Sequence, residues 1–359
     1  MKSRLFSVVM CSICILLTGC QKSKENSKNS GQASSSLDLF AMDTYMNLKV
    51  FCDDMDTAKK ALQDGETRIH ELESLFSVTD PDSDVSRINQ NAGNFTEIHP
   101  DTEIILETAR RIHTESNGAL SVSIYPVLKE WGFTTGNYQI PDSEILRDLL
   151  DSVDDTQILV QEHQVSIPDQ MQIDFGALAK GYTGDQLISL FREYGAESAL
   201  INLGGNVQAL GTKPDGNPWN VAVVNPFEPE QNMCLLQIAD KAVITSGNYE
   251  RYFTGEDGQK YWHIIDPADG FPADNGLVSV TVIGENGLLC DALSTALFIM
   301  GTEQAAAYWQ TLQNSVSDMD MILVTEDRKI LVTETLLESG NFQNLSHFPV
   351  EVISYDKTD

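Results

Sequence analysis

The chain has 359 residues and carries 53 acidic against 23 basic side chains, which gives a formal net charge of −30 at pH 7. A surface this acidic repels nucleic acid and anionic lipid headgroups, so nucleic-acid binding and attachment to a membrane by charge are both excluded. Single hydrophobic cores stop growing at about 250 to 300 residues, and this chain is longer than that. We therefore expect one globular body with two lobes.

The N-terminus has the pattern of an export signal. Lys2 and Arg4 precede an apolar run, Leu5–Leu17, which is too short to span a bilayer as a permanent helix. The run ends in Leu17-Thr18-Gly19-Cys20. This resembles the lipobox of bacterial lipoproteins, in which the cysteine receives acyl chains such as palmitate and becomes the first residue after cleavage. An ordinary secretory signal with an incidental cysteine is the alternative.

We expect residues 1–19 to be a lipoprotein signal peptide, and residues 20–36 to be the lipidated Cys20 followed by a flexible tether. Gln21–Ser36 holds almost only Gln, Lys, Ser, Asn and Gly, so it has no apolar surface whose burial could offset the entropy lost on ordering. The composition turns globular at Leu37, which makes residues 37–359 the expected folded domain. This domain would lie outside the cytoplasm, anchored to the cell membrane through Cys20.

Three cysteines follow the expected anchor: Cys52, Cys234 and Cys290. An odd number of widely spaced cysteines does not form a disulfide framework. The sequence after Cys20 contains no CxxC motif and no His/Cys cluster with zinc spacing, so a structural zinc site is not expected.

The periodicity of apolar residues predicts a mixture of helices and strands. Leu39–Phe51 alternates apolar and polar residues and predicts a strand, and Thr57–Phe76 has the spacing of a helix. Later helices are expected at 101–115, from Pro141-Asp142-Ser143 onward, and at 177–194, 288–300 and 303–312. Later strands are expected at 198–203, 219–224, 234–238, 261–265 and 277–283, with hairpins at 158–167 and at 321–324 with 330–332. Because strands and helices do not alternate strictly and no GxGxxG opens a βαβ unit, the pattern predicts an α+β fold.

The segment Ile173–Tyr182 places a carboxylate, Asp174, at a strand end, and a lysine, Lys180, in the first turn of a helix. Free N–H groups at a helix N-terminus suit a phosphate. A lysine there opposes the helix dipole unless an anion lies between them. The alternative is a surface lysine that points to water.

Asp291 and Thr295 are four residues apart on a predicted helix, so one helix face can offer a carboxylate and a hydroxyl oxygen to a hard cation. The alternative is that Asp291 caps the helix and Thr295 packs its methyl group.

Two further segments carry weaker signals. His263 ends a predicted strand before Asp266-Pro267, where a histidine can act as a base, although most such histidines only pack. Leu203-Gly204-Gly205-Asn206 allows a ligand to approach the backbone or simply forms a tight turn.

In combination and in this order, these segments resemble the FAD:protein FMN transferases, the ApbE lipoprotein family. The resemblance covers the whole globular part and implies a two-lobed ApbE-like fold with mostly antiparallel sheets and flanking helices. The other matching segments are Ala41–Met46, Phe76-Ser77, Ser86–Asn89, Gly118-Ala119, Tyr125-Pro126, Trp131–Phe133 and Thr245–Tyr249.

The resemblance also implies a site. The residues that would contact FAD are Met42, Ala119, Leu120, Ser121, Asp174, Lys180 and Ile265. The metal, Mg²⁺ or another divalent ion, would be bound by the carbonyls of Ala177 and Ser294 and the side chains of Asp291 and Thr295. The family usually has a phenylalanine and an aspartate after Gly118-Ala119, whereas this chain has Leu120 and Ser121.

The implied reaction moves the FMN half of FAD onto a Thr or Ser hydroxyl of an acceptor protein and releases AMP, with His263 as the base. Acceptors in the family are flavin-bearing subunits of membrane redox pumps and other exported flavoproteins. Two alternatives remain open on the sequence alone. One is an FAD pyrophosphatase, in which water replaces the protein hydroxyl, and the other is a flavin-binding lipoprotein without catalysis.

The lipobox generates a first prediction. We expect Cys20→Ala to release or mislocalise the protein, because the acyl chains are the expected membrane contact, while the purified protein keeps its activity. Detergent partitioning of the variant measures this, with Cys14→Ala as the control, since Cys14 leaves with the signal. Partitioning unchanged by Cys20→Ala would contradict lipidation at this position.

Overall fold

A nine-stranded sheet organises the fold of the computed structural model, which describes residues 32–312 and 319–354. Its strands in order are β1 (Ala33–Ala41), β2 (Thr44–Cys52), β6 (Ser198–Leu203), β7 (Asn206–Leu210), β10 (Ala242–Gly247), β13 (Leu277–Gly284), β14 (Asp320–Thr325), β15 (Ile330–Thr333) and β17 (Val350–Ile353). Neighbouring strands are antiparallel, except that β15 and β17 are parallel.

Three small antiparallel sheets accompany it. They consist of β16 (Phe342–Asn344), β9 (Asn232–Ile238) and β8 (Trp219–Val224); of β3 (Thr96–Glu97), β5 (Gln164–Ser166) and β4 (Leu159–Gln161); and of β11 (Tyr252–Thr254) with β12 (Lys260–Trp262). The mostly antiparallel α+β class predicted from the sequence is therefore correct.

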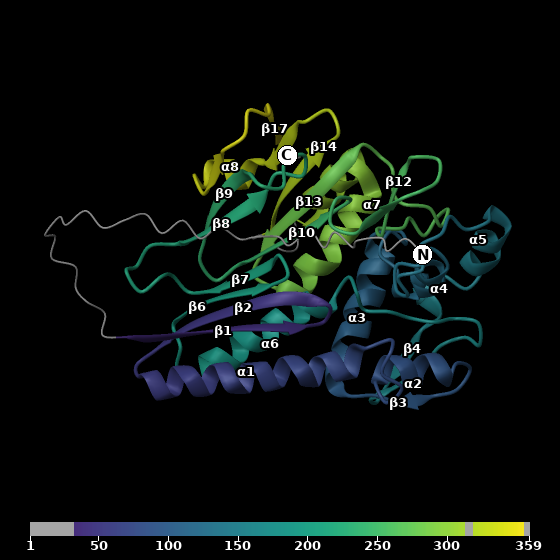
Figure 1. Cartoon of the computed structure of the whole chain (residues 1–359), viewed down its shortest axis with the longest axis horizontal. Coiled ribbons are helices and arrows are strands. Elements are labelled where there is room, and N and C mark those ends of the chain that lie inside the picture. The colour runs from purple at the N-terminus through teal and green to yellow at the C-terminus, as the bar shows by residue number, and fades with distance from the viewer. Residues whose placement is uncertain (1–31, 313–318, 355–359) are drawn as a thin grey trace, which may run out of the picture. The chain divides into compact units, whose positions relative to one another are not determined.

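Helices cover the nine-stranded sheet and connect its strands. They are α1 (Met55–Phe76), α2 (Asp84–Gln90), α3 (Pro100–Glu115), α4 (Tyr125–Glu130), α5 (Ser143–Leu150), α6 (Ala179–Glu193), α7 (Gly287–Leu312) and α8 (Glu334–Glu338), with short 3₁₀ turns η1 (Val122–Ile124) and η2 (Asp155–Gln157). Helix α1 lies along β1 and β2, and α7 packs against β10 and β13 (Figure 1). Helix α6 contacts both α1 and α7, so it connects the helix over the β1 end of the sheet to the helix over its middle.

The first part of α7, residues 287–300, has no exposed residue, as a helix segment without a polar face requires. Its path breaks at Gly301, whose φ of 74° and ψ of 174° are not helical. This break separates the two helices that the sequence predicts at 288–300 and 303–312. Despite its apolar character, neither α7 nor any other helix in the described ranges has the length and composition needed to cross a membrane.

The N-terminal part differs from the prediction in two places. The single strand expected over Leu39–Phe51 is a hairpin, because Met42 and Asp43, both with positive φ, form a two-residue turn between β1 and β2. Strand β1 also begins at Ala33, inside the expected tether, where Ser36 pairs with Lys49. Backbone pairing with β2 orders these residues without an apolar side-chain pattern. The rest of the expected tether, the signal peptide and Cys20 lie outside the described residues.

The strand near His263 and the cysteines were also predicted from the sequence. The strand predicted over Tyr261–Ile265 ends at Trp262, and Ile265 instead forms an isolated bridge with Pro272. The three cysteines of the described part, Cys52, Cys234 and Cys290, are free and buried. The described residues form a single compact unit.

Helices α6 and α7 approach each other at Gly181. A Cβ atom added to Gly181 would lie 2.2 Å from the carbonyl oxygen of Gly287 and 2.6 Å from Cβ of Asp291. Only glycine permits this approach, because a backbone carbonyl cannot move aside as a side chain can.

We expect Gly181→Ala to lower the midpoint of thermal unfolding, because the added methyl group overpacks a backbone contact at a cost of about 1 to 3 kcal/mol. Gly65→Ala is the matched control, since its Cβ would meet only the side chains of Leu187 and Phe191, at 3.3 Å. An unchanged midpoint for Gly181→Ala would contradict the close approach.

Candidate functional site

The first part of the site is the carboxylate of Asp291 on α7, which is 5% exposed. Its Oδ2 accepts the Gly181 N–H at 2.8 Å. Asp291 does not cap its helix, because the N–H groups of Gly287 and Leu288 at the start of α7 donate to Asp185, at 2.7 and 2.8 Å. The helix-cap alternative for Asp291 is therefore wrong.

Gly181 lies in the first turn of α6, which begins at Ala179. Backbone N–H groups in a first turn have no partner within their own helix, and Asp291 accepts this one. No described residue donates a hydrogen bond to the carbonyl of Ala177, just before the helix. This carbonyl and the Asp291 carboxylate both have capacity for a cation.

Hydroxyl groups lie one turn further along α7. Ser246 Oγ of β10 is 2.8 Å from Ser294 Oγ and 3.3 Å from Thr295 Oγ1. Ser294 is fully buried and its hydroxyl donates to the Asp291 carbonyl at 2.8 Å. Within the described ranges no cluster of three His, Cys, Asp or Glu side chains could hold a metal. The oxygens of this corner, carbonyl, carboxylate and hydroxyl, nevertheless fit a hard cation that completes its shell with substrate or water.

Lys180 and Asp174 lie beside this corner. The Asp174 carboxylate accepts the Gly176 N–H at 2.7 Å. Burial raises the pKa of Asp174, while that hydrogen bond and the charges of Arg251 and Lys180 oppose the rise. Lys180 is half-buried in the first turn of α6. Its charge therefore faces the site and not only open water.

His263 follows β12, and its Nδ1 is 3.2 Å from the Arg251 carbonyl. Since a carbonyl can only accept, Nδ1 carries the proton and Nε2 keeps its lone pair. The ring stands edge-on to Phe133, with centroids 6.4 Å apart. Burial and the positive charges of Arg251 and Lys180 lower the pKa of His263 to about 3, so the ring is neutral at physiological pH.

The sequence-based prediction missed Glu250 and Arg251, which directly follow the matched segment Thr245–Tyr249. Burial raises the pKa of Glu250 to about 7, with Lys180 and Arg251 opposing and Asp291 adding to the rise. Arg251 donates to the Phe133 carbonyl at 2.6 Å.

Glu250 is exposed, and Asp174 and His263 are half-buried, yet protein atoms desolvate all three side chains. The charges of Lys180 and Arg251 act on all three groups, so the three side chains lie near one another. Two hollows beside α6, one lined by Asp185 and Gln208 and the other by Arg68 and Gln186, include none of these three.

The flavin-contacting residues implied by the resemblance come from several segments. Met42, in the β1–β2 turn, donates its N–H to Glu73 at 2.6 Å, and its sulfur accepts the Thr183 hydroxyl of α6 at 3.8 Å. The turn is thereby fixed against α1 and α6. Ile265 is buried at 4% exposure.

Ala119, Leu120 and Ser121 are 8%, 1% and 7% exposed. Leu120 packs in the core, and the Ser121 hydroxyl donates to Asp155 at 2.8 Å. The side chains of Leu120 and Ser121 are thus directed at protein partners. This segment joins the rest of the site through the Asp174 N–H, which donates to the Val122 carbonyl at 3.0 Å.

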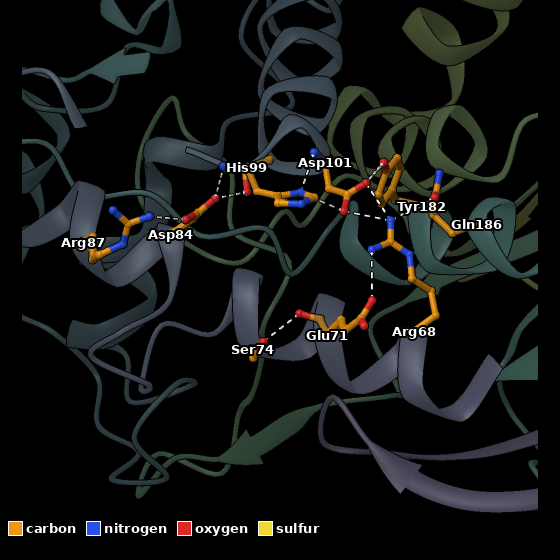
Figure 2. Close-up of polar contacts among 10 residues, drawn as sticks. Arg68, Glu71, Ser74, Asp84, Arg87, His99, Asp101, Tyr182 and Gln186 are labelled. Carbon is orange, nitrogen blue, oxygen red and sulfur yellow. Dashed lines mark hydrogen bonds and ion pairs between the residues drawn. The ribbon is translucent and has the colours of Figure 1, made fainter. Parts of the chain in front are cut away.

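A polar network also holds the start of α6. Figure 2 shows Arg68, Asp101, His99 and Tyr182 converging from α1, the start of α3 and α6. Arg68 donates to both Asp101 oxygens at 2.7 Å, and the Tyr182 hydroxyl donates to Asp101 Oδ1 at 2.5 Å. Because Tyr182 follows Gly181, two consecutive residues at the start of α6 are fixed by carboxylates, Asp101 and Asp291.

Known proteins are similar to this chain in sequence and in fold. A model of the ApbE family matches residues 42–319. An FAD:protein FMN transferase of Klebsiella pneumoniae (strain 342) is 34% identical over 295 residues, which is 80% of this chain and 87% of that relative. One of Treponema pallidum (strain Nichols) is 30% identical over 296 residues, covering 77% and 80%.

Solved structures of ApbE proteins are also similar to this chain. The ApbE protein of Thermotoga maritima superposes with a TM-score of 0.79 at 28% identity and covers 85% of this chain and 99% of its own. The flavin transferase ApbE of Vibrio cholerae gives 0.76 at 25% identity, covering 86% and 99%. The expected family and fold are confirmed: the chain belongs to the ApbE family.

Proposed function

We propose that this chain transfers the FMN half of FAD to a Ser or Thr hydroxyl of an acceptor protein and releases AMP, with the help of a divalent metal. The observation that carries the proposal is the grouping of Asp291, Lys180 and His263. Asp291 accepts the N–H of Gly181, the residue after Lys180, and the charge of Lys180 acts on His263. The names of the relatives support the same activity.

The metal would be held by the Asp291 carboxylate, the Thr295 hydroxyl and the carbonyls of Ala177 and Ser294. This donor set of hard oxygens favours Mg²⁺. When bound, the ion would neutralise charge on the pyrophosphate of FAD. Such help is needed in a chain with a net charge of −30, whose overall field repels a phosphorylated ligand.

The reaction breaks one P–O bond of the pyrophosphate and forms another. The acceptor hydroxyl attacks the phosphorus on the FMN side, its proton passes to Nε2 of His263, and AMP leaves. Lys180 would stabilise the negative charge that develops on the phosphate oxygens. Burial lowers the pKa of His263, and the positive charges of Arg251 and Lys180 lower it further. Bound phosphate would offset these charges and make Nε2 a stronger base.

The acceptor and the location of the protein are part of the same proposal. We propose an acceptor of the flavin-bearing, membrane-associated or exported kind, reached from the outer face of the cell membrane to which Cys20 tethers the chain. The support is Leu17-Thr18-Gly19-Cys20, which lies outside the described residues.

We expect Asp291→Asn to reduce metal-dependent transfer by about 10²-fold or more, since metal charge stabilisation is worth several kcal/mol. The amide oxygen can still accept the Gly181 N–H, so the fold should survive. Thr295→Ala should have a smaller effect, because water can replace a neutral oxygen. The measurement is the transfer rate as a function of Mg²⁺ concentration. Full activity with an unchanged Mg²⁺ dependence in Asp291→Asn would place the metal elsewhere.

We expect His263→Ala to slow transfer about 10²- to 10⁴-fold, because a general base acts in the transition state. FAD affinity should stay near that of the unaltered protein. Single-turnover rate and FAD dissociation constant are measured on the same variant, with His70→Ala on α1 as an exposed-histidine control. Weakened FAD binding with a near-normal rate would show that His263 only packs.

A further inference from the structure

Asp155 is a buried carboxylate that no part of the proposed mechanism uses. It opens the 3₁₀ turn η2 and is 0% exposed. Its two oxygens accept from Ser121 Oγ at 2.8 Å, Val122 N at 2.8 Å, Ser123 N at 3.0 Å and Ser123 Oγ at 2.6 Å. A buried charge is tolerated when donors surround it, and here all four donors come from three consecutive residues.

These three residues continue the segment that contains Ala119 to Ser121. Leu120 is held from the other side, because its carbonyl lies 2.8 Å from Nδ1 of His113, which is itself 3.8 Å from Asp155. The sequence Gly118–Ile124 has no carboxylate of its own. The conformation of the segment therefore depends on a negative charge supplied from more than thirty residues away.

The same segment supports Asp174. The Val122 carbonyl accepts the Asp174 N–H at 3.0 Å. The preceding residue, Ile173, exchanges two hydrogen bonds with the Asn89 amide, at 2.7 and 2.9 Å. A chain of hydrogen bonds thus runs from Asp155 through Val122 to the backbone of Asp174.

We infer that Asp155 is a positioning residue that shapes the Ala119–Ser123 segment and Asp174 for FAD. This inference rests on the proposed function, because it assumes that the segment faces FAD. FAD binding measured without an acceptor separates a failure of this inference from a failure of the proposed function, since binding does not require transfer.

The test compares FAD dissociation constants of the full-length chain, measured by flavin fluorescence. We expect Asp155→Asn to weaken FAD binding about tenfold or more. The NH₂ group of the new asparagine would face other donors and leave buried polar groups unpaired. The rate at saturating FAD should change far less than the affinity. Asp154→Asn is the matched control, since Asp154 is bonded only within its own turn, to Thr156 and Gln157.

A second variant moves the charge. Ser121→Asp combined with Asp155→Ser places the carboxylate within the segment, and we expect it to restore most of the affinity lost in Asp155→Asn. Ser123→Ala, which removes one hydroxyl donor and keeps the charge, is a milder probe that should weaken binding by a smaller factor. Normal FAD affinity in folded Asp155→Asn and in Ser123→Ala, with only a lowered unfolding temperature, would overturn the inference. If Asp155→Asn does not fold, normal affinity in Ser123→Ala alone would overturn it.

Discussion

The hydrogen bond between the Gly181 N–H and the Asp291 carboxylate connects the fold to the chemistry. It needs the close approach of α6 and α7, which only a glycine at position 181 permits. It also satisfies an N–H group in the first turn of α6, which has no partner within its own helix. One packing contact therefore holds the carboxylate of the proposed metal site at the start of the helix that carries Lys180.

The electrostatics of the site differ from those of the chain as a whole. The net charge of −30 repels anions, whereas Lys180 and Arg251 act together on Asp174 and Glu250, and they lower the pKa of His263. A phosphorylated ligand would meet the two cations Lys180 and Arg251 within an acidic protein. Burial and these charges keep His263 neutral, so an anion that offsets the charges would make the proposed base stronger.

Much of this organisation could be predicted from the sequence because it is local. The strands Ser198–Leu203 and Trp219–Val224 have the bounds that their periodicity predicts. The Met42-Asp43 turn was missed, since neither residue is the glycine or asparagine typical of such turns. Glu250 and Asp155 were missed for another reason: their roles come from partners distant in sequence, such as Lys180 and Ser121. No spacing rule predicts such contacts.

Transfer of FMN to a protein hydroxyl distinguishes the proposed activity from its alternatives. The most direct measurement incubates the full-length chain with FAD, Mg²⁺ and an acceptor protein that carries the target Ser or Thr, and quantifies AMP, free FMN and flavin bound covalently to the acceptor. We predict AMP and flavinylated acceptor in equal amounts, both lost when the metal is chelated. Equal amounts of AMP and free FMN, with no flavinylated acceptor, would contradict transfer and indicate hydrolysis of FAD, and the absence of AMP would indicate flavin binding alone.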